Sequence, residues 1–402
     1  MQPRIAIVGA GIGGLTAAIA MLRRGLDVTV FEQAPALGEI GAGVQLGPNA
    51  LKVLGALGLD GAVIERAVEP GAHVLRSWKN GETLFSTPIR GVFQEKFGAG
   101  YYQIHRADLH AILARAVPAD HIRLNARAVS VRNEADRAVL RFADGNEADF
   151  DAVIGADGIH SVIRASLLGP ESPRFTGNIC WRGIARTEAL PPGHIARDVN
   201  VWLGPHGHIV HYYVRGGALV NFVAIYEADD WRQESWSASG DKAELLKTYA
   251  GWNESLLTLF ERTEQLNKWA LYDRNPLPRW TDGRITLLGD AAHPMLPYLA
   301  QGACMAIEDG FALARWLSQP GGVGAALKGY EAMRLPRASQ VQLGARARAK
   351  VNHLSSPLAR IVRDVSYAWR RVFDRESTSY KIDWVYAYDV TAAPIAPETK
   401  AA

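Results

Sequence analysis

The stretch "RIAIVGAGIGGLTAAIAMLRRGLDVTVFE", residues 4–32, decides the fold of this chain. Its short apolar run, residues 5–8, is rich in β-branched side chains and ends at a glycine, as a buried parallel strand does. The following alanine- and leucine-rich segment predicts a helix over about residues 13–24 that stops at Gly25, and residues 28–31 predict a second strand. The order strand, glycine turn, helix, strand is typical of a Rossmann-like unit.

The glycine turn has the spacing of a dinucleotide fingerprint. Gly9, Gly11 and Gly14 lie between the first strand and the helix, and Glu32 ends the second strand. Gly9 permits a tight turn, Gly11 lets a pyrophosphate approach the backbone, and Gly14 lets the helix pack closely on the strand. Free amides at the helix N-terminus suit a phosphate, and Glu32 can accept hydrogen bonds from a ribose diol. We expect a bound dinucleotide here, either FAD or a nicotinamide nucleotide.

Size and composition limit the classes of protein that remain. The 402 residues suggest two or three domains, and 48% apolar with 21% charged residues is an ordinary globular composition. A net charge of +3 gives no indication of nucleic-acid binding. The two cysteines, Cys180 and Cys304, provide neither a disulfide framework nor a cysteine metal site, and both are interpreted as small buried residues. Without a signal-peptide pattern or a membrane-length apolar segment, a cytoplasmic location is expected.

Two later stretches again place a strand before a turn. In "ADFDAVIGADGIHSVIR", residues 148–164, a strand leads to Asp157, and in "RITLLGD", residues 284–290, another delivers Asp290. Ligands of open α/β sheets bind at such carboxyl ends of strands. The second stretch continues as "AAHPMLPYLAQGACMAIEDG", which indicates a stiff, proline-containing loop that feeds a helix starting near Gly302.

Taken in order, "GAGIGG", "GADGIHSVIR" and "GDAAHPMLPYLAQG" resemble the three motifs of the single-component FAD-dependent aromatic hydroxylases of the para-hydroxybenzoate hydroxylase type. The resemblance covers nearly the whole chain. The segments "GAGVQLGPNALKVL", "HRADLHAIL" and "AQGACMAIED" are most similar to salicylate, 3-hydroxybenzoate and 6-hydroxynicotinate hydroxylases. The resemblance implies tightly but non-covalently bound FAD, NADH or NADPH as co-substrate, and O₂ that reaches a small phenolic aromatic acid through a flavin C4a-hydroperoxide.

The same resemblance implies an α/β fold, with a Rossmann-like FAD-binding domain, an inserted mixed-sheet substrate domain and a C-terminal helical segment. The FAD-binding domain would comprise residues 1–72, 100–177 and 271–345. Residues 73–99 and 178–270 would form the substrate-binding domain, and residues 346–402 the helical segment.

Several cofactor contacts follow from matching this chain to the family. Asp290 would hold the ribityl or pyrophosphate region of FAD, and the helix beginning at Gly302 and Ala303 would aim its amides at the N1 and C2 carbonyl side of the flavin. Arg106 would reach the phosphate or ribityl side, unless it is only a solvated helix residue, and Asp157 would lie near the pyrophosphate and the path of the nicotinamide nucleotide.

The floor of the site is implied in the same way. Gln45 would lie close to both flavin and substrate, and Pro297 and Tyr298 would line the isoalloxazine ring and the substrate. The chain departs from the commonest family pattern at Leu296, where proline is usual, and at residues 299–300, where Leu-Ala replaces a glycine pair. These departures concern the shape of the substrate floor.

The segment "HIVHYYVRGGALVNFVAIYE", residues 208–227, predicts two strands joined by a turn. Because side chains alternate along a strand, His208 and Tyr212 share one face, while His211 and Tyr213 share the other. Similar hydroxylases carry a histidine and a tyrosine facing the substrate at the first pair of positions. We expect His208 to accept or relay the phenol proton and Tyr212 to position the hydroxyl or carboxylate.

Two other interpretations of this segment are weaker. Arg215 could pair with a substrate carboxylate, although an arginine beside a turn is more often solvated. The histidines of "HGHIVH" invite a metal site, but only His206 and His208 share a face and no carboxylate accompanies them at ligand spacing. No metal is therefore expected.

The last residues combine arginines with aromatic side chains, which can indicate a membrane-surface helix. Ile361, Val365, Ala368 and Val372 recur at helical spacing, and this favours packing on the body of the protein or on a partner subunit. A homodimer is the expected assembly, with a small aromatic molecule as the other partner.

Two alternative functions stay open on the sequence alone. A flavin reductase or dehydrogenase of the same fold would act on an isoprenoid or amine without inserting oxygen. A nucleotide-binding regulatory protein would bind the dinucleotide without turnover. The segments "AQGACMAIED" and "HPMLP" favour the hydroxylases over both.

Overall fold

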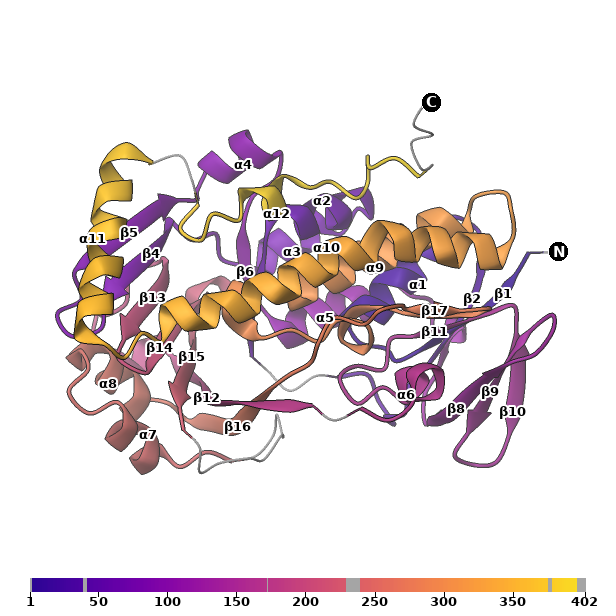
Figure 1. Cartoon of the computed structure of the whole chain (residues 1–402), viewed down its shortest axis with the longest axis horizontal. Coiled ribbons are helices and arrows are strands. Elements are labelled where there is room, and N and C mark those ends of the chain that lie inside the picture. Colours follow the sequence, from indigo (N-terminus) through magenta and orange to yellow (C-terminus); the bar gives the residue numbers. More distant parts are fainter. Residues whose placement is uncertain (1, 39–41, 172, 229–238, 375–377, 396–402) are drawn as a thin grey trace.

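A six-stranded sheet carries the predicted dinucleotide unit. In this computed structural model, residues 2–38, 42–171, 173–228, 239–374 and 378–395 are described. The strands follow the order β17 (Thr281–Asp282), β18 (Ile285–Leu287), β11 (Ala152–Gly155), β1 (Arg4–Val8), β2 (Asp27–Phe31) and β7 (Ile122–Arg123). All neighbours in it pair in parallel except the short β17 (Figure 1). The predicted strands at residues 5–8, 28–31 and 152–154 are confirmed, and that at 284–288 is confirmed in a shorter form.

Helices cover this sheet with a continuous apolar core. Helix α1 (Ile12–Leu22) follows β1 and is buried almost throughout, because its side chains are nearly all aliphatic or small. Helix α9 (Gly302–Leu317) begins where the sequence predicts a helix start and packs against α1. The remaining helices of this part are α2 (Pro48–Ala56), α3 (Asp60–Arg66), α5 (Arg106–Arg115) and α6 (Val162–Leu168).

Two small sheets complete this part of the chain. One is a meander of β8 (Ala128–Asn133), β9 (Ala138–Phe142) and β10 (Glu147–Phe150). The other pairs β3 (Gly43–Leu46) with β6 (Tyr102–His105) in antiparallel register. Short 3-10 turns occur at Ala119–His121, Thr187–Ala189, Arg215–Gly217, Gly289–Ala291 and Pro297–Leu299.

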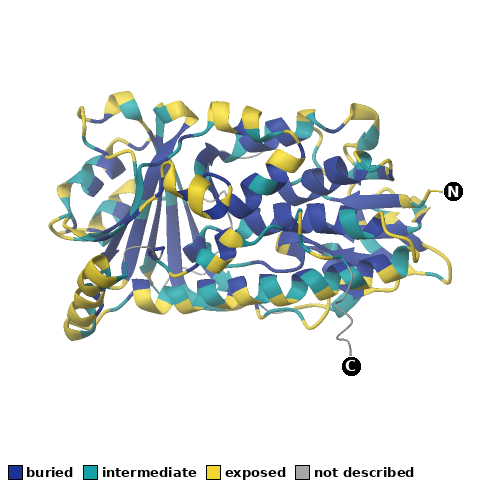
Figure 2. Ribbon diagram, turned by 90° about the horizontal axis from the view of Figure 1, so that it is seen from above, coloured by how far each residue is buried: buried dark blue, intermediate teal, exposed yellow. Residues whose placement is uncertain are grey.

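A seven-stranded mixed sheet forms the second layer. Its order is β16 (Gln265–Asp273), β12 (Arg174–Arg186), β15 (Leu219–Glu227), β14 (Gly207–Val214), β13 (Val199–Gly204), β4 (Ala72–Ser77) and β5 (Thr83–Pro88). One face packs against α7 (Lys242–Thr248) and α8 (Glu254–Glu261), through a core that includes Tyr213 and Phe222. The opposite face meets the turn at residues 297–299 and α4 (Val92–Phe97) through a separate core. Figure 2 shows these strands as mostly buried.

Three C-terminal helices complete the chain. Helix α10 (Val323–Asn352) runs along the molecule from the first sheet to the second, and α11 (Pro357–Phe373) lies at the end farthest from the N-terminus (Figure 1). Helix α12 (Asp383–Ala387) returns towards α2 and α4. The predicted fold class is therefore confirmed: a Rossmann-like domain, a mixed sheet and C-terminal helices.

Two details differ from expectation. The proposed boundary at residues 345–346 falls inside α10, and that at 270–271 falls inside β16. The predicted packing of the apolar positions of α11 on the body of the protein is wrong: Ile361, Val365 and Val372 are 54–62% exposed, and Ala368 is also exposed. A stripe at helical spacing specifies an apolar face without specifying what covers it.

Candidate active site

The glycine turn between β1 and α1 has the geometry of a phosphate cradle. Gly9 adopts a positive φ of 106°, and a Cβ there would lie 2.4 Å from the carbonyl oxygen of Ala156. A Cβ on Gly14 would lie 2.1 Å from the carbonyl oxygen of Gly9, so only glycine lets the helix approach this closely. At Gly11, the N-cap residue of α1, a Cβ would meet no atom within 4 Å. The space in front of the helix amides is open, which fits a pyrophosphate.

Glu32 and Asp157 flank this cradle. The Glu32 carboxylate accepts hydrogen bonds from the amides of Ala10 and Ala34, both at 2.9 Å, and so joins the end of β2 to the glycine turn. The Asp157 carboxylate accepts from the Ser161 hydroxyl at 2.5 Å and from the Val162 amide at 2.7 Å, at the start of α6. Its place beside Gly9 puts it next to the predicted pyrophosphate position, and its own bonds hold that turn in shape.

The loop from residue 289 to 301 feeds the N-terminus of α9. Asp290 is exposed in an otherwise buried stretch, while Gly302 and Ala303 are the only partly exposed residues in the first half of the helix. A Cβ on Gly302 would lie 3.9 Å from a carboxylate oxygen of Asp290. The buried side-chain nitrogen of Gln301 finds no hydrogen-bond partner within the described residues. Exposed helix amides, a carboxylate and an unpartnered donor together fit the polar edge of a flavin.

A buried ionic cluster fastens this loop to the helices behind it. Asp309 accepts hydrogen bonds from His293 at 2.5 Å, from the Gly289 amide at 3.0 Å and from Arg334 at 2.8 Å. Neighbouring Glu308 pairs with Arg334 at 2.5 Å. Burial alone would raise the pKa of Asp309, but His293 and Arg334 lower it to about 2. The cluster gives His293 a structural role, because its ring bonds to Asp309. In the sequence, only the Glu-Asp pair inside an apolar helix indicated this cluster.

Gln45 and Tyr212 meet where the two layers touch. Gln45 lies on β3 and accepts a hydrogen bond from Tyr101 at 2.5 Å, and it shares another with Tyr212 of β14. A Cβ on Gly43 would lie 2.7 Å from the Tyr212 hydroxyl, so this glycine makes room for the ring. Burial raises the pKa of Tyr212 to about 12, which keeps the phenol protonated. The structure therefore brings these two predicted substrate residues together.

His208 occupies the same sheet face as Tyr212, as the alternation predicts. Its ring packs 5.4 Å from that of Tyr298, and its Nδ1 lies 2.8 Å from Nε2 of His353. Burial lowers the pKa of His208 well below its usual value, with contributions from His353 and Arg348. On the opposite face, His211 accepts a hydrogen bond from the Trp202 indole at 2.8 Å. The sequence indicated Tyr298 through the loop motif, but nothing marked His353.

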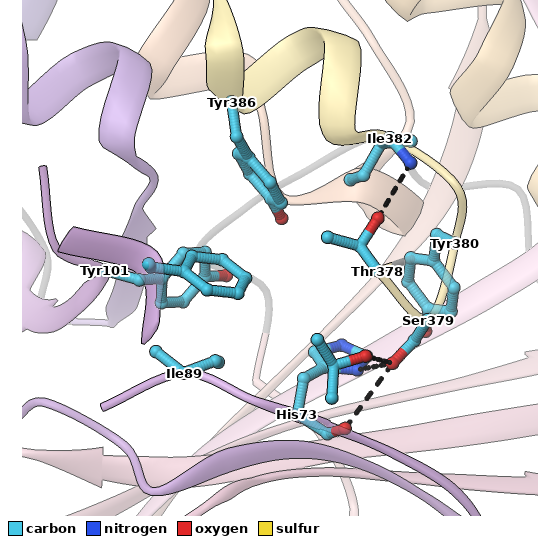
Figure 3. A pocket seen from close by; sticks show the side chains of 10 residues that line it. His73, Ile89, Tyr101, Thr378, Ser379, Tyr380, Ile382 and Tyr386 are labelled. Carbon is cyan, nitrogen blue, oxygen red and sulfur yellow. Dashed lines mark hydrogen bonds between the residues drawn. The ribbon is translucent and has the colours of Figure 1, made fainter. Parts of the chain in front are cut away.

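A small cavity of about 20 Å³ lies between β4, α4 and residues near the C-terminus (Figure 3). Its wall comes largely from segments that the sequence did not mark: His73, Thr87, Ile89, Phe93, Tyr101, Thr378, Ser379, Tyr380, Ile382 and Tyr386. Tyr101 links the cavity to Gln45 through its hydroxyl. Ser379 closes one side with hydrogen bonds to Thr87 at 2.7 Å and His73 at 3.1 Å. Aromatic residues near the C-terminus were the only sequence signal for this wall.

Other candidates lie elsewhere. Arg106 begins α5, and its amide donates to the carbonyl of Ala42 at 2.7 Å, near the cofactor side of β3. Arg215 as a partner of the substrate is wrong, because its guanidinium pairs with Asp108 at 3.0 Å on the surface. His206 is exposed and pairs with Glu227 at 2.8 Å, a carboxylate that the sequence spacing did not suggest.

Three features of the described residues bear on other classes of function. They contain no group of three or more histidine, cysteine or acidic side chains placed to hold a metal ion. Within the same ranges, none of the helices is both long enough and apolar enough to cross a bilayer. Cys180 and Cys304 are both buried free thiols, and burial raises the pKa of each to about 12. Neither thiol is set up as a nucleophile.

Comparisons with known proteins agree with this geometry. The family profile described as FAD binding domain matches residues 3–344. The 3-amino-4-hydroxybenzoate 2-monooxygenase of Streptomyces platensis is 40% identical over 395 residues, which cover 98% of each chain. The 6-hydroxynicotinate 3-monooxygenase of Pseudomonas fluorescens is 36% identical over 406 residues, which cover 100% of this chain and 99% of the relative. The 3-hydroxybenzoate 6-hydroxylase of Klebsiella oxytoca is 36% identical over 391 residues, 96% of each.

A solved structure gives the same result for the cofactor. The crystal structure of Klebsiella pneumoniae HpxO complexed with FAD and uric acid superimposes with a TM-score of 0.84 at 27% identity, and the match covers 98% of each chain. The expected resemblance and the expected FAD are both confirmed. This chain belongs to the FAD-binding-domain family and is an FAD-dependent aromatic monooxygenase.

Proposed function

We propose that this monooxygenase hydroxylates a small aromatic carboxylate that already carries a ring hydroxyl, with NADH or NADPH as reductant. The observation that carries the proposal is the face of β14 that bears His208 and Tyr212, because His208 packs its ring against Tyr298 of the loop before α9. The relatives named above act on 3-amino-4-hydroxybenzoate, 6-hydroxynicotinate and 3-hydroxybenzoate, all of which are aromatic carboxylates with a hydroxyl.

FAD would be held by the glycine cradle with Glu32, by Asp290 and by the amides of Gly302 and Ala303. When bound, FAD supplies the electron transfer and the oxygen chemistry that no side chain can supply. The work of the chain is to orient the ring, exclude water and manage one proton. The buried polar groups around Gln45 suit the orientation of a hydroxyl-bearing ring, because each would lose a partner if the hydroxyl were missing.

His208 is the proposed proton acceptor. Its lowered pKa keeps the imidazole neutral at pH 7, so one ring nitrogen has a free lone pair for the phenol proton. Its Nδ1 is engaged by His353, which leaves Nε2 for the substrate. Transfer of the proton makes the ring oxygen a phenolate and raises the electron density at the carbon to be hydroxylated.

Arg348 is the candidate partner of the substrate carboxylate in place of Arg215. Its guanidinium stacks 3.8 Å from the centre of the Tyr380 ring in the cavity wall and donates to the Tyr367 hydroxyl at 2.6 Å. Burial is the main cause of the lowered pKa of His73 and of His208, and the charge of Arg348 contributes to both. Among the described residues, no acidic side chain pairs with it. An uncompensated guanidinium beside an aromatic cavity suits a carboxylate.

The test uses the flavin as reporter. The holoenzyme is mixed anaerobically with NADH and each of a panel of hydroxylated aromatic acids, and the substrate is the acid that accelerates loss of the oxidised flavin absorbance. In air, oxygen consumption should match hydroxylated product. NADH oxidation without product across the panel would reject the proposal in favour of a reductase.

The role of His208 has its own test. His208→Ala should lower the hydroxylation rate by about 100-fold or more, with FAD content unchanged. His206→Ala, two residues away and exposed, is the matched control and should behave as wild type. Equal rates in the two variants would reject His208 as the base. Two further expectations remain proposals: the cytoplasm as location, supported by the two free thiols, and a small aromatic molecule as the ligand.

A further inference from the structure

Helix α11 exposes a large apolar face. Seven of its large hydrophobic side chains are 54–71% exposed: Leu358, Ile361, Val362, Val365, Trp369, Val372 and Phe373. Figure 2 shows the helix at this end of the molecule mainly as exposed. No other described helix exposes more than two such side chains. A helix facing water normally has its polar side outward, so this arrangement is reversed.

The polar side of α11 faces the protein instead. Arg363 is buried and pairs with Asp364 at 2.9 Å, and Tyr367 is buried beside Phe85. Arg370 donates to the carbonyls of Ser379 and Thr378 at 3.1 and 3.0 Å. Because the two hydrogen bonds of Arg370 tie α11 to residues 378–379, the helix cannot turn its apolar face inward without breaking them. The exposed face needs a partner from outside the described chain.

The spacing of this face indicates which partner it fits. Ile361, Val365, Ala368 and Val372 recur at intervals of four, three and four, which is the seam of a two-helix coiled coil. The seven exposed side chains present roughly 900 Å² of surface, close to the roughly 800 Å² per partner of a stable interface. Two arginines of α11 are already engaged within the chain and do not face a membrane surface: Arg370 donates to the carbonyls of Ser379 and Thr378, and buried Arg363 pairs with Asp364 of the same helix.

We propose that this face, the α11 stripe, pairs with the α11 stripe of a second copy of the chain about a two-fold axis. Such a contact is self-complementary, so one apolar face suffices for both subunits. It would also brace the segment at residues 378–380, which Arg370 ties to the helix and which lines the cavity.

The experiment is sedimentation velocity on the holoenzyme over a concentration series. The wild-type chain should sediment as a dimer, and Val365→Glu as a monomer with a dimer Kd raised by at least about 100-fold, because two buried carboxylates would face each other. Ile361→Glu is a second variant with the same expectation. Leu343→Glu, at an exposed site on α10, is the matched control and should remain dimeric.

FAD content should be unchanged in all variants, since each site is exposed in one chain. A wild-type monomer at every concentration would overturn the proposal, as would a Val365→Glu dimer. A monomer that co-floats with vesicles of anionic phospholipid would assign the stripe to a membrane surface instead.

A separate observation concerns His353, which ends α10. Its Nδ1 lies 3.0 Å from the side-chain oxygen of Asn178, whose amide nitrogen donates to the carbonyl of Thr176 at 3.0 Å. The Asn178 oxygen can only accept, so His353 carries its proton on Nδ1 and presents a lone pair at Nε2. His208 must then donate from Nδ1, and its Nε2 is left free to accept. The hydrogen bonds thus set both tautomers.

Burial lowers the pKa of His353 to about 4, but the end of α10 supplies one feature that favours a positive charge there. His353 caps the C-terminus of the 30-residue helix α10, where the helix dipole favours a cation. The groups around it are His208, Tyr298 and Asn178. Its protonation is opposed mainly by burial and to a smaller extent by the more distant His206. The positive charge of Arg348 likewise opposes protonation of His208. Transfer of a proton from His208 to His353 therefore relieves this repulsion.

We infer that His353 is a positioning residue that receives the substrate proton through His208, an inference that rests on the proposed role of His208. The phenol O–H bond breaks as His208 Nε2 takes the proton, and the Nδ1 proton of His208 moves to Nε2 of His353. His208 is again neutral, and His353 becomes an imidazolium that donates from Nδ1 to Asn178. The proton leaves to water when the product is released.

His353→Gln tests this step, because glutamine can keep both hydrogen bonds but cannot titrate. We expect hydroxylation at pH 7 to slow by about tenfold or more and to recover as the pH rises, with KM, FAD content and the rate of flavin reduction unchanged. Added imidazole should rescue His353→Ala. A wild-type pH profile in His353→Gln, with His208→Ala still slow, would overturn this inference alone. Wild-type rates in both variants would also overturn the proposed base.

Discussion

Removing Arg334 should cost far more stability than removing an equally well bonded arginine on the surface. Arg334 is fully buried and pairs with Glu308 at 2.5 Å and with Asp309 at 2.8 Å. Arg334→Met keeps most of the volume but leaves buried negative charge without its counter-ion. Breaking a buried pair in this way costs about 3–5 kcal/mol, because a charge is left uncompensated in a low dielectric. We expect the free energy of unfolding to fall by that amount.

The matched control is Arg132→Met. Arg132 makes two hydrogen bonds of 2.8 Å to Glu147, yet both side chains are exposed, so water replaces the lost partner. Urea denaturation of the two variants in the presence of FAD should therefore differ clearly in midpoint. Adding Glu308→Gln and Asp309→Asn to Arg334→Met should restore part of the loss, since the uncompensated charges are then gone.

The cluster also ties the flavin loop to α9 through His293 and Gly289. Arg334→Met should therefore release FAD at a lower urea concentration than the one that unfolds the chain. Equal losses in Arg334→Met and Arg132→Met would refute the reasoning, as would a triple variant no more stable than the single one.

Three further predictions use other features. Burial lowers the pKa of four histidines: to about 3 for His73 and His211, to about 4 for His353, and well below the usual value for His208. In the unfolded chain the histidine pKa values lie near about 6.5, so the unfolded chain binds protons first as the pH falls. Stability should drop below about pH 6.5 by up to roughly 5 kcal/mol per pH unit, and a urea midpoint unchanged between pH 7.5 and 5.5 would contradict this. Gly11→Ala should weaken FAD binding while changing the unfolding free energy of the apoprotein by less than about 1 kcal/mol. Gly14→Ala should destabilise the apoprotein by about 1–3 kcal/mol, because its Cβ would meet the backbone of Gly9. Equal unfolding free energies of the two apoprotein variants would disprove the close packing at Gly14. Ala300 has a φ of 53°, which glycine adopts more easily than alanine, so Ala300→Gly should leave the protein equally stable or up to about 1 kcal/mol more stable. Ala347→Gly, on the exposed side of α10, should instead destabilise the protein by about 0.5–1 kcal/mol. Thermal unfolding of the two variants measures both effects.

The glycine turn was predictable because its requirements are local. The spacing of Gly9, Gly11 and Gly14 follows from backbone sterics within one strand and one helix, and the structure shows those contacts. The faces of β14 were predictable for the same kind of reason, since side chains alternate along any strand and the register with β15 only fixes which neighbours they meet. The resemblance in three motifs added the cofactor, which periodicity could not identify.

The proton path and the cavity depended on tertiary structure. His208 and His353 are 145 residues apart in sequence, and their hydrogen bond exists only because α10 crosses from one sheet to the other. The cavity wall likewise joins β4 to residues near the C-terminus. Arg215 depended on tertiary structure too. Its position beside a turn left a substrate contact open, but its guanidinium pairs with Asp108 of α5.

The sequence by itself determined the dinucleotide unit, the strand faces and the family, because each is written in short-range spacing. Only the tertiary structure decided the partners of the buried charges and which side of α11 faces water. The physical reason is that spacing fixes the direction of a side chain relative to its own element, whereas its partner depends on how distant elements pack.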